Sequence, residues 1–436
     1  MWTLVLLAVC LAPTYGAAVG AKPDSPEKES YVGHRLVGVT PTNKEQVEFL
    51  HELGETGHLG LDFWLDPMLD HETRVRVPPN VYARFVDLLT QAGLTHVVVV
   101  EDVQGLIDNP PELGQYDMST YNFVSGIADH TKYHQLSQIN TYITGFANSF
   151  TGVTASSLPH NTYEGRSTRY LEITGGSSSN KKRIVIEAGI HAREWITPAS
   201  MLYFVDRMLH ERSNPGSQAE FLYNNFEWYI VPVTNPDGYS YTHTNSRLWR
   251  KNRNICSGTS SRGIDLNRNF DANFGGGGSS GSCASDTYRG PSAFSEAESR
   301  NMRDLVSSIK ATKGAISAYI SVHCYSQYLL TPYGYAYNTV PANDAEIRRI
   351  TNLARTAILN RPDGKSYVVG TPAEILYVAS GISADWARLR EEIPYTMTYE
   401  LRPSAGTSNG FVLPTSEIIP TGDEVWASLF AIASEL

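Results

Sequence analysis

The chain has 436 residues, 41% of them hydrophobic and 18% charged, which is enough for two globular domains and argues against a disordered protein. Its formal net charge of −10 argues against nucleic acid and against an anionic membrane surface as partners. Composition does not identify a substrate, so the function has to be sought in local motifs.

The N-terminus has the pattern of a secretory signal peptide. An apolar run over residues 4–12 is followed by Pro13 and by small residues at 16–18, which suit a signal-peptidase site. The segment before the run has no Lys or Arg, and a membrane span is the alternative interpretation. A span needs about 20 apolar residues, roughly twice the length of this run. We therefore expect residues 1–17 to be removed and the protein to be secreted, without a membrane anchor.

Cysteine usage agrees with export. Removal of the signal peptide takes Cys10 away and leaves Cys256, Cys283 and Cys324. The first two flank a Gly-rich loop, where one disulfide is expected in an oxidising compartment. Cys324 then has no partner and is expected to be a small buried side chain on a strand.

Residues 31–101 predict a small α+β domain. Apolar runs predict strands at 31–39, 61–65, 74–77 and 95–100, with amphipathic helices near 45–53 and 81–89. A capping box formed by Thr42 and Glu45 is expected to begin the first helix. The order β-α-β-β-α-β is typical of the ferredoxin-like arrangement. No cluster of catalytic side chains stands out in this domain.

A second pattern begins near residue 133, after a Pro- and Gly-rich boundary at 102–125. Apolar strands are predicted at 170–174, 183–187, 226–233, 315–322 and 395–399. Helices are predicted to begin near residue 136 and to cover 196–211, 295–309, 345–359 and 424–432. This alternation predicts an α/β domain with a mixed, mostly parallel sheet and helices on both faces.

Metal-ligating side chains follow the predicted strands of this domain. His191 and Glu194 come just after the strand at 183–187, and His323 ends the strand at 315–322. A catalytic zinc site uses three protein ligands and leaves one position open. Glu400 closes the strand at 395–399, where a carboxylate can act as a general base. Together they predict a catalytic zinc site at the carboxyl ends of the strands.

Cationic side chains lie in two connecting loops. Arg250 and Arg268 can bind a carboxylate through two hydrogen bonds or stabilise an oxyanion, although a surface basic cluster is the alternative. Asp265, three residues before Arg268, can orient a metal-bound imidazole through a hydrogen bond.

Several motifs in order then resemble the secreted zinc metallocarboxypeptidases of the pancreatic carboxypeptidase A/B type. The motifs are HAREW (191–195), TNPDGY (234–239), RLWRK (247–251), DLNRN (265–269), SVHCYSQ (321–327), YVASG (377–381) and YELR (399–402). The segment before them resembles the activation propeptide of that family. The resemblance implies a sheet of the eight-stranded type and a proenzyme with three parts. These are a signal peptide at 1–17, a propeptide at 18–117 and a catalytic domain at 118–436.

The resemblance also implies a role for each matching residue. One zinc ion per chain is expected on His191, Glu194 and His323, with Glu400 as the general base for zinc-bound water. Arg250 matches the residue that stabilises the oxyanion. The substrate's free C-terminal carboxylate is expected on Asn267, Arg268 and Tyr377, with Arg193 and Tyr325 as accessory positions. The implied partners are peptide and protein substrates, an activating protease, and the propeptide as inhibitor.

The specificity pocket resembles the A type. Relatives that remove C-terminal Lys or Arg carry an Asp just before an Asp-Trp pair, and this chain has Ala384 before Asp385 and Trp386. Gly334 also resembles the A type, whereas Ile382 stands where Gly is usual. We therefore expect a preference for apolar or aromatic C-terminal residues. The alternatives are a B-type or broad-specificity enzyme, an inactive binding protein, and a propeptide that persists as a regulatory inhibitor.

The linker between the two domains departs from the family pattern. Proenzymes of this type are commonly cut at a basic residue, but the chain has no Lys or Arg from Phe85 to Thr131. We expect another protease to cut near residues 109–120, or removal to be partial or unusual.

Overall fold

The computed structural model describes residues 28–57, 59–114 and 127–436. The predicted signal peptide at 1–17 and the predicted boundary between residues 117 and 118 lie outside these ranges. Within them, no helix is both long enough and apolar enough to cross a membrane.

The N-terminal domain has the predicted element order. It comprises β1 (Arg35–Val39), α1 (Lys44–Thr56), β2 (Asp62–Leu65), β3 (Thr73–Val77), α2 (Tyr82–Gln91) and β4 (His96–Val100). The strands form an antiparallel sheet in the order β2-β3-β1-β4, which is the ferredoxin-like arrangement. Leu50 of α1 and Phe85 of α2 are fully buried against Val37 and Val75 of the sheet. A short helix α3 (Val103–Asp108) leads out of the domain.

The predicted cap of α1 is wrong by one residue. The N-cap is Asn43, whose side chain accepts a hydrogen bond from the Gln46 backbone N–H at 2.9 Å. The Gln46 side chain reaches back to accept from the backbone N–H of Thr42 at 2.8 Å. Asn43 therefore caps the Gln46 N–H, one residue beyond the Glu45 N–H that Thr42 was expected to cap, and Glu45 stays exposed.

The C-terminal domain is built on an eight-stranded mixed sheet in the order β11-β10-β12-β9-β7-β8-β6-β5. The strands are β5 (Val153–Ser157), β6 (Arg169–Ile173), β7 (Lys182–Ala188), β8 (Phe226–Val231), β9 (Ala318–Ser326), β10 (Tyr328–Leu330), β11 (Val368–Gly370) and β12 (Tyr395–Ser404). The central strands β8, β7, β9 and β12 are parallel, and antiparallel pairs flank them on both sides. The fold predicted from sequence is confirmed.

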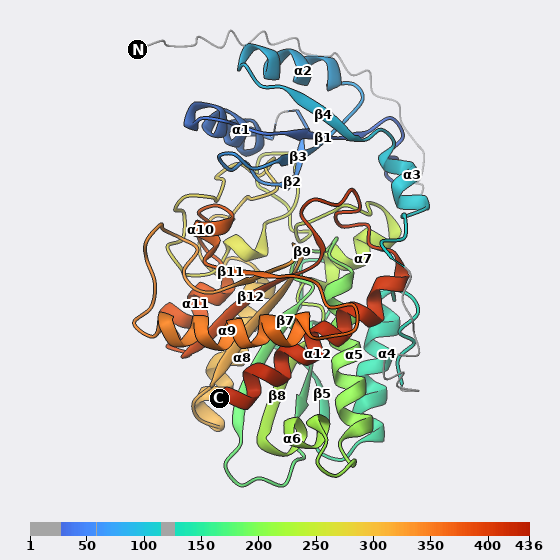
Figure 1. Cartoon of the computed structure of the whole chain (residues 1–436), viewed down its shortest axis with the longest axis vertical. Helices are drawn as coiled ribbons and strands as arrows, with labels where there is room; N and C mark the ends of the chain where they lie inside the picture. Colours follow the sequence, from blue (N-terminus) through green and yellow to red (C-terminus); the bar gives the residue numbers. More distant parts are fainter. Residues whose placement is uncertain (1–27, 58, 115–126) are drawn as a thin grey trace.

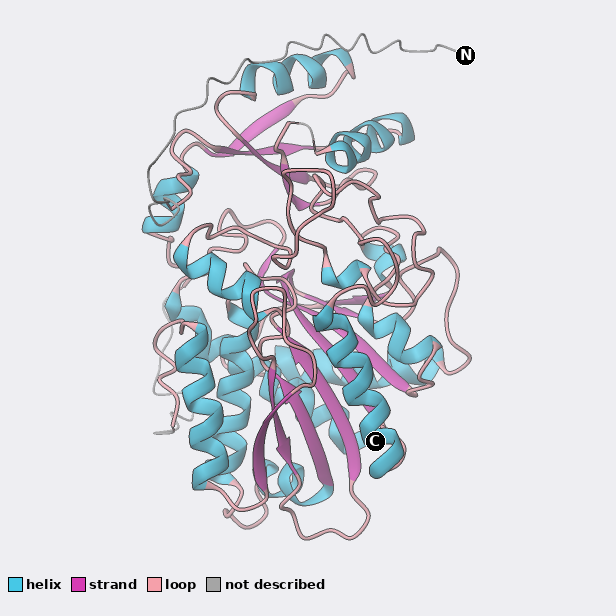
Figure 2. Ribbon diagram, turned by 180° about the vertical axis from the view of Figure 1, so that it is seen from behind, coloured by secondary structure: helices cyan, strands magenta, loops and turns pink. Residues whose placement is uncertain are grey.

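Helices cover both faces of this sheet, as Figures 1 and 2 show. One face packs against α4 (Leu136–Ser149), α5 (Ile196–Glu211), α6 (Gln218–Asn225), α9 (Asp344–Leu359) and α12 (Ile418–Glu435). The other face packs against α8 (Ala297–Thr312) and α11 (Ser383–Leu389). Ile184 and Ile186 of β7 face the first layer and Val185 faces the second, so the whole strand is apolar and buried.

Two further helices lie near the loops at the carboxyl end of the sheet. They are α7 (Pro236–Thr244) and α10 (Pro372–Ile375). In Figure 1 the N-terminal domain, drawn in blue, sits over this same end of the molecule. The end of the sheet at which the predicted zinc ligands lie therefore faces the N-terminal domain.

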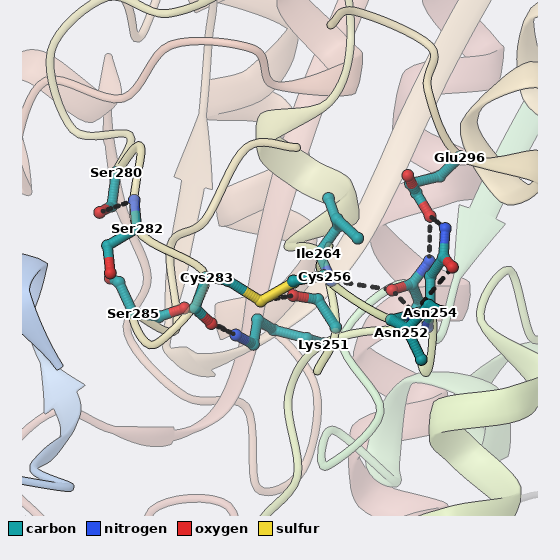
Figure 3. Close-up of a disulfide and its surroundings, with 12 residues drawn as sticks. Lys251, Asn252, Asn254, Cys256, Ile264, Ser280, Ser282, Cys283, Ser285 and Glu296 are labelled. Carbon is teal, nitrogen blue, oxygen red and sulfur yellow. Dashed lines mark hydrogen bonds between the residues drawn. A yellow bond between two sulfur atoms is a disulfide. The ribbon is translucent and has the colours of Figure 1, made fainter. Parts of the chain in front are cut away.

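Cys256 and Cys283 form the predicted disulfide, shown in Figure 3, and Cys324 is free and buried. Beside the disulfide, the buried ammonium of Lys251 donates to the backbone carbonyls of Cys283 at 2.7 Å and Ser285 at 2.8 Å. The cross-link and this ammonium hold the loop that carries Arg250.

Replacing both cysteines by serine should lower the free energy of unfolding by about 3 kcal/mol, because the bond closes a loop of 27 residues. Denaturant unfolding measures this difference. Wild-type protein treated with a reductant is the matched control and should fall to the level of the double variant. An unchanged unfolding midpoint in both samples would contradict the expected contribution.

Candidate metal centre and substrate cavity

His191, Glu194 and His323 meet at the carboxyl end of the sheet. Gly189, with φ of 61°, turns the chain after β7 and delivers His191 and Glu194 before α5 begins. Their ligand atoms all lie within 4.8 Å of one another, and all three side chains are buried.

The three side chains fit a zinc ion. Glu194 Oε1 lies 2.8 Å from His191 Nδ1, Glu194 Oε2 lies 3.4 Å from His323 Nδ1, and the two Nδ1 atoms are 3.2 Å apart. Ligand atoms at about 2.0–2.1 Å from a tetrahedral zinc are separated by about 3.3 Å. Two imidazole nitrogens facing each other beside a carboxylate form a donor set that a cation stabilises.

His323 and Glu400 lie inside strands, although both were expected at strand ends. Parallel pairing of β9 with β12 continues past them through Cys324 and Leu401, so the sheet is longer than the apolar runs suggest. His323 and Glu400 are directly paired in this register. The pairing places the carboxylate of the second strand beside a ligand from the first.

The environment of Glu400 strongly affects its proton affinity. Burial raises the pKa of its carboxyl to about 8, with His323 opposing the rise and the Glu194 carboxylate adding to it. A cation held by the three ligands would favour the ionised form. Glu400 lines the same cavity as the ligands.

Asp265 joins a ligand to a cationic side chain. Its Oδ1 lies 3.1 Å from His191 Nε2, and its Oδ2 accepts from Arg250 Nη2 at 2.9 Å. Burial opposes ionisation, but Arg250 and His191 hold the pKa of Asp265 well below its usual range. The Nε2 contact leaves His191 Nδ1 directed at the ligand group, as a metal-bound imidazole requires.

Arg268, Asn267 and Tyr377 form a second polar group in the cavity. Arg268 Nη2 donates to the Tyr377 hydroxyl at 3.0 Å, and its Nε donates to the Gly278 carbonyl at 2.7 Å. The Asn267 amide nitrogen lies 3.2 Å from His323 Nε2, on the far side of that ring from the ligand group. The guanidinium is therefore held in place in the cavity that the metal ligands also line.

Arg193 and Tyr325, the two accessory positions, also belong to the cavity lining. Arg193 Nη1 donates to Asp62 Oδ1 of the N-terminal domain at 2.7 Å, and its guanidinium stacks on the Phe411 ring at 3.9 Å. Tyr325 packs edge-on against the same ring. Both Arg193 and Tyr325 line the cavity.

Ala384, which the resemblance assigns to the specificity pocket, is not among the residues that line this cavity. It is buried in the first turn of α11. Ile382, two residues earlier, is among the lining residues, together with Leu330, Pro372, Leu376 and Thr398. In the sequence, Ile382 stands where the family usually has Gly, and the motifs assign it no role.

The N-terminal domain contributes residues that sequence reasoning missed. Phe63, Trp64, Leu65 and Asp66, in β2 and just after it, line the same cavity as the metal ligands. Asp62 is buried between Arg193 and Arg76. Asp62 is an acidic residue at the start of an otherwise apolar strand, and this feature of the sequence could have pointed to a contact with the other domain.

The comparisons with known proteins agree with this geometry. Residues 139–428 match the zinc carboxypeptidase family, and residues 37–110 match the carboxypeptidase activation peptide. The chain therefore belongs to the zinc carboxypeptidase family, as a zinc-dependent peptide hydrolase preceded by an activation propeptide.

Among its relatives, carboxypeptidase A2 of Rattus norvegicus is 36% identical over 406 residues, which cover 93% of this chain and 94% of the relative. Carboxypeptidase A1 of Bos taurus is 35% identical over 434 residues, covering 99% and 98%. The solved structure of carboxypeptidase A from Helicoverpa armigera matches with a TM-score of 0.79 at 30% identity, covering 93% of this chain and 98% of that chain. Thrombin activatable fibrinolysis inhibitor also matches at 0.79, with 29% identity and 92% and 98% coverage.

Proposed function

We propose that this protein is a secreted carboxypeptidase of the A type, made as a zymogen, that releases apolar residues from the C-termini of peptides and proteins. The observation that carries the proposal is the position of Arg268. Its guanidinium, bonded to Tyr377, shares one cavity with the His191–Glu194–His323 group and Glu400. An exopeptidase needs a cationic group that recognises the terminal carboxylate at a fixed distance from the hydrolytic group.

These positions suggest a separate role for each residue in the reaction. When bound to the three ligands, zinc polarises the scissile carbonyl and lowers the pKa of water towards neutrality. Glu400 accepts the proton of the attacking water at its carboxylate and can return it to the leaving amine. Arg250, fixed by Asp265, stabilises the developing oxyanion. Asn267, Arg268 and Tyr377 hold the terminal carboxylate and so fix which peptide bond is cut.

The absence of a carboxylate facing the pocket supports the A-type preference. The described residues that line the apolar part of the cavity include no Asp or Glu of the catalytic domain besides Glu194 and Glu400. Asp385 is buried and accepts a hydrogen bond from the Gly334 backbone N–H at 2.8 Å, outside the lining. The names of the relatives, carboxypeptidases A1 and A2, support the same preference.

Matched peptides that differ only in the C-terminal residue test this preference on the activated enzyme. Leu or Phe should be released faster than Arg, and a chelator should abolish the activity. Faster release of Arg would favour the B-type alternative. An absence of hydrolysis with one zinc bound per chain would favour the inactive binding protein.

We also propose that the N-terminal domain inhibits the enzyme by filling the cavity. The Asp62 carboxylate bonds to Arg193 at 2.7 Å and to Arg76 at 3.1 Å, and all three side chains are largely buried. Burial raises the pKa of Asp62, but the two guanidinium groups outweigh it and lower the pKa from 3.8 to about 2. The contact is thus fully present above pH 3.8 and is lost only as the pH falls through about 2.

Replacing Asp62 by Asn should raise the activity of the uncleaved proenzyme. Breaking a buried ion pair by removing one partner costs about 3–5 kcal/mol, which corresponds to a shift of about 10²–10⁴ in the equilibrium that exposes the cavity. Hydrolysis of a small peptide by the intact chain measures the effect. Arg76→Gln is the matched control: it removes the bond within the propeptide but keeps the one to Arg193, so its effect should be smaller. Equal activity of the Asp62 variant and the wild type would contradict the inhibitory contact.

We propose that activation uses a protease that does not require Lys or Arg, with secretion as the preceding step. The linker has no basic residue from Phe85 to Thr131. N-terminal sequencing of the secreted product tests both points: a start within residues 109–120 supports the proposal, and a start after Arg84 or Lys132 contradicts it. A cleaved propeptide that stays bound would support the regulatory alternative.

A further inference from the structure

The cavity continues beyond the carboxylate-binding group into an apolar compartment. We call it the side-chain pocket, formed by Leu330, Pro372, Leu376, Ile382 and Thr398. Leu330 of β10 and Thr398 of β12 are paired neighbours in the sheet, and the Leu376 backbone N–H donates to the Pro372 carbonyl at 2.8 Å. These residues therefore surround one space.

A substrate can reach this pocket with one side chain. If its terminal carboxylate lies at Arg268 and its last peptide bond lies at the metal ligands, the side chain between them is that of the C-terminal residue. The remaining apolar part of the cavity is the side-chain pocket. This step rests on the proposed function.

The tip of the Ile382 side chain lies beside Gly334 and the ring of Pro372, and both Ile382 and Pro372 line the pocket. A Cβ built on Gly334 would lie 2.9 Å from Ile382 Cδ1 and 3.1 Å from Pro372 Cγ. Gly334 therefore allows the tip of the Ile382 side chain to come this close to its backbone. Glycine at position 382 would leave the volume of this branched side chain free beside Pro372.

The backbone around Ile382 is fixed. The Gly381 N–H donates to the Ala272 carbonyl at 2.7 Å, and the Ser383 N–H donates to the Asn267 side-chain oxygen at 2.9 Å. Gly381 has φ of 78°, and a Cβ there would lie 2.2 Å from the Arg268 carbonyl oxygen. The position of Ile382 is thus fixed relative to Asn267 and Arg268, the residues proposed to bind the substrate carboxylate.

We propose that Ile382 sets the length of the side-chain pocket and makes the enzyme prefer aliphatic C-terminal residues to aromatic ones. A packed wall discriminates by size, because an oversized side chain must displace neighbours that have no free space. One methylene in an apolar pocket changes the specificity ratio by about 10- to 200-fold, and an aromatic ring exceeds Val or Leu by more than one carbon. Ala384 is buried in α11 and is not among the lining residues, so we expect its small size to have less effect on the pocket than Ile382 has.

The test compares release of C-terminal Val, Leu, Phe and Arg from otherwise identical peptides by activated wild type, Ile382→Gly and Ile382→Val. The readout is the ratio of kcat/KM for Phe to that for Leu within one preparation, which cancels any loss of folded enzyme. Wild type should favour Leu over Phe by about tenfold or more. Ile382→Gly should raise the Phe/Leu ratio at least about tenfold, and Ile382→Val should raise it less.

Val378→Ala is the matched control, because Val378 is in the same loop and packs towards Gly277 outside the cavity lining. Its Phe/Leu ratio should equal that of wild type. If Leu and Phe are both released faster than Arg but the ratio does not change in Ile382→Gly, the inference is overturned and the proposed function stands. If wild type releases Phe faster than Leu, the inference is likewise overturned. Fastest release of Arg overturns both.

Discussion

Replacing Glu400 by Gln should lower kcat/KM for a peptide substrate by about 10³–10⁴-fold, at the upper end of what general acid–base catalysis contributes. The amide keeps the shape of the side chain but cannot accept a proton. Because Glu400 is paired with His323 without belonging to the ligand group, the variant should still bind one zinc ion per chain. Steady-state kinetics together with metal analysis of the same sample measure both quantities.

Glu391→Gln is the control for this variant. Glu391 forms an ion pair with Lys310 on the surface, at 2.7 Å, and is not part of the cavity. Its activity should match that of the wild type. A Glu400→Gln enzyme with full zinc content and a rate within tenfold of wild type would show that another group takes the proton.

Replacing Arg268 by Gln should lower kcat/KM for peptides with a free C-terminal carboxylate by about 10²–10⁴-fold. The guanidinium is buried and is positioned by the Gly278 carbonyl and the Tyr377 hydroxyl, and losing one partner of a buried charged pair costs about 3–5 kcal/mol. The loss should fall mainly on substrates with the charged terminus. A peptide amide, already a poor substrate for wild type, should lose little further activity.

Arg289→Gln is the matched control for Arg268. Arg289 also donates to a carbonyl of the Gly-rich loop, that of Ser279 at 3.1 Å, but it does not line the cavity. Its kcat/KM should be unchanged. Equal losses on the free acid and on the amide in Arg268→Gln would mean that this side chain supports the fold instead of recognising the carboxylate.

Most strands of the sheet and the residues of the metal centre could be predicted from the sequence, because both depend on local patterns. The apolar runs of β7 and β9 are long, and each is followed or ended by a metal-ligating side chain, so His191, Glu194 and His323 can be grouped from the sequence alone. The three-residue strands β10 and β11 were not predicted, since they are too short to show a period. The lengths of β9 and β12 were underestimated because pairing continues beyond the apolar residues.

Contacts between distant segments could not be predicted in this way. Asp62 and Arg193 are separated by 131 positions, and neither residue indicates its partner locally. Gly334 and Ile382 are likewise brought together only by the folding of two loops. The family motifs single out Ala384 for the specificity pocket, and the cavity lining contains Ile382, to which the motifs assign no role. The proposed role of Ile382 therefore depends on packing between distant segments, which the motifs do not show.

The decisive experiment is hydrolysis by the activated enzyme of a single peptide with either a free or an amidated C-terminus, with and without a chelator. The arrangement of Arg268 beside the His191–Glu194–His323 group predicts rapid release of one residue at a time from the free acid. It also predicts little reaction of the amide, and loss of activity with chelator that added zinc restores. Cleavage of the amide at an equal rate, or unchanged hydrolysis after removal of all zinc, would contradict it.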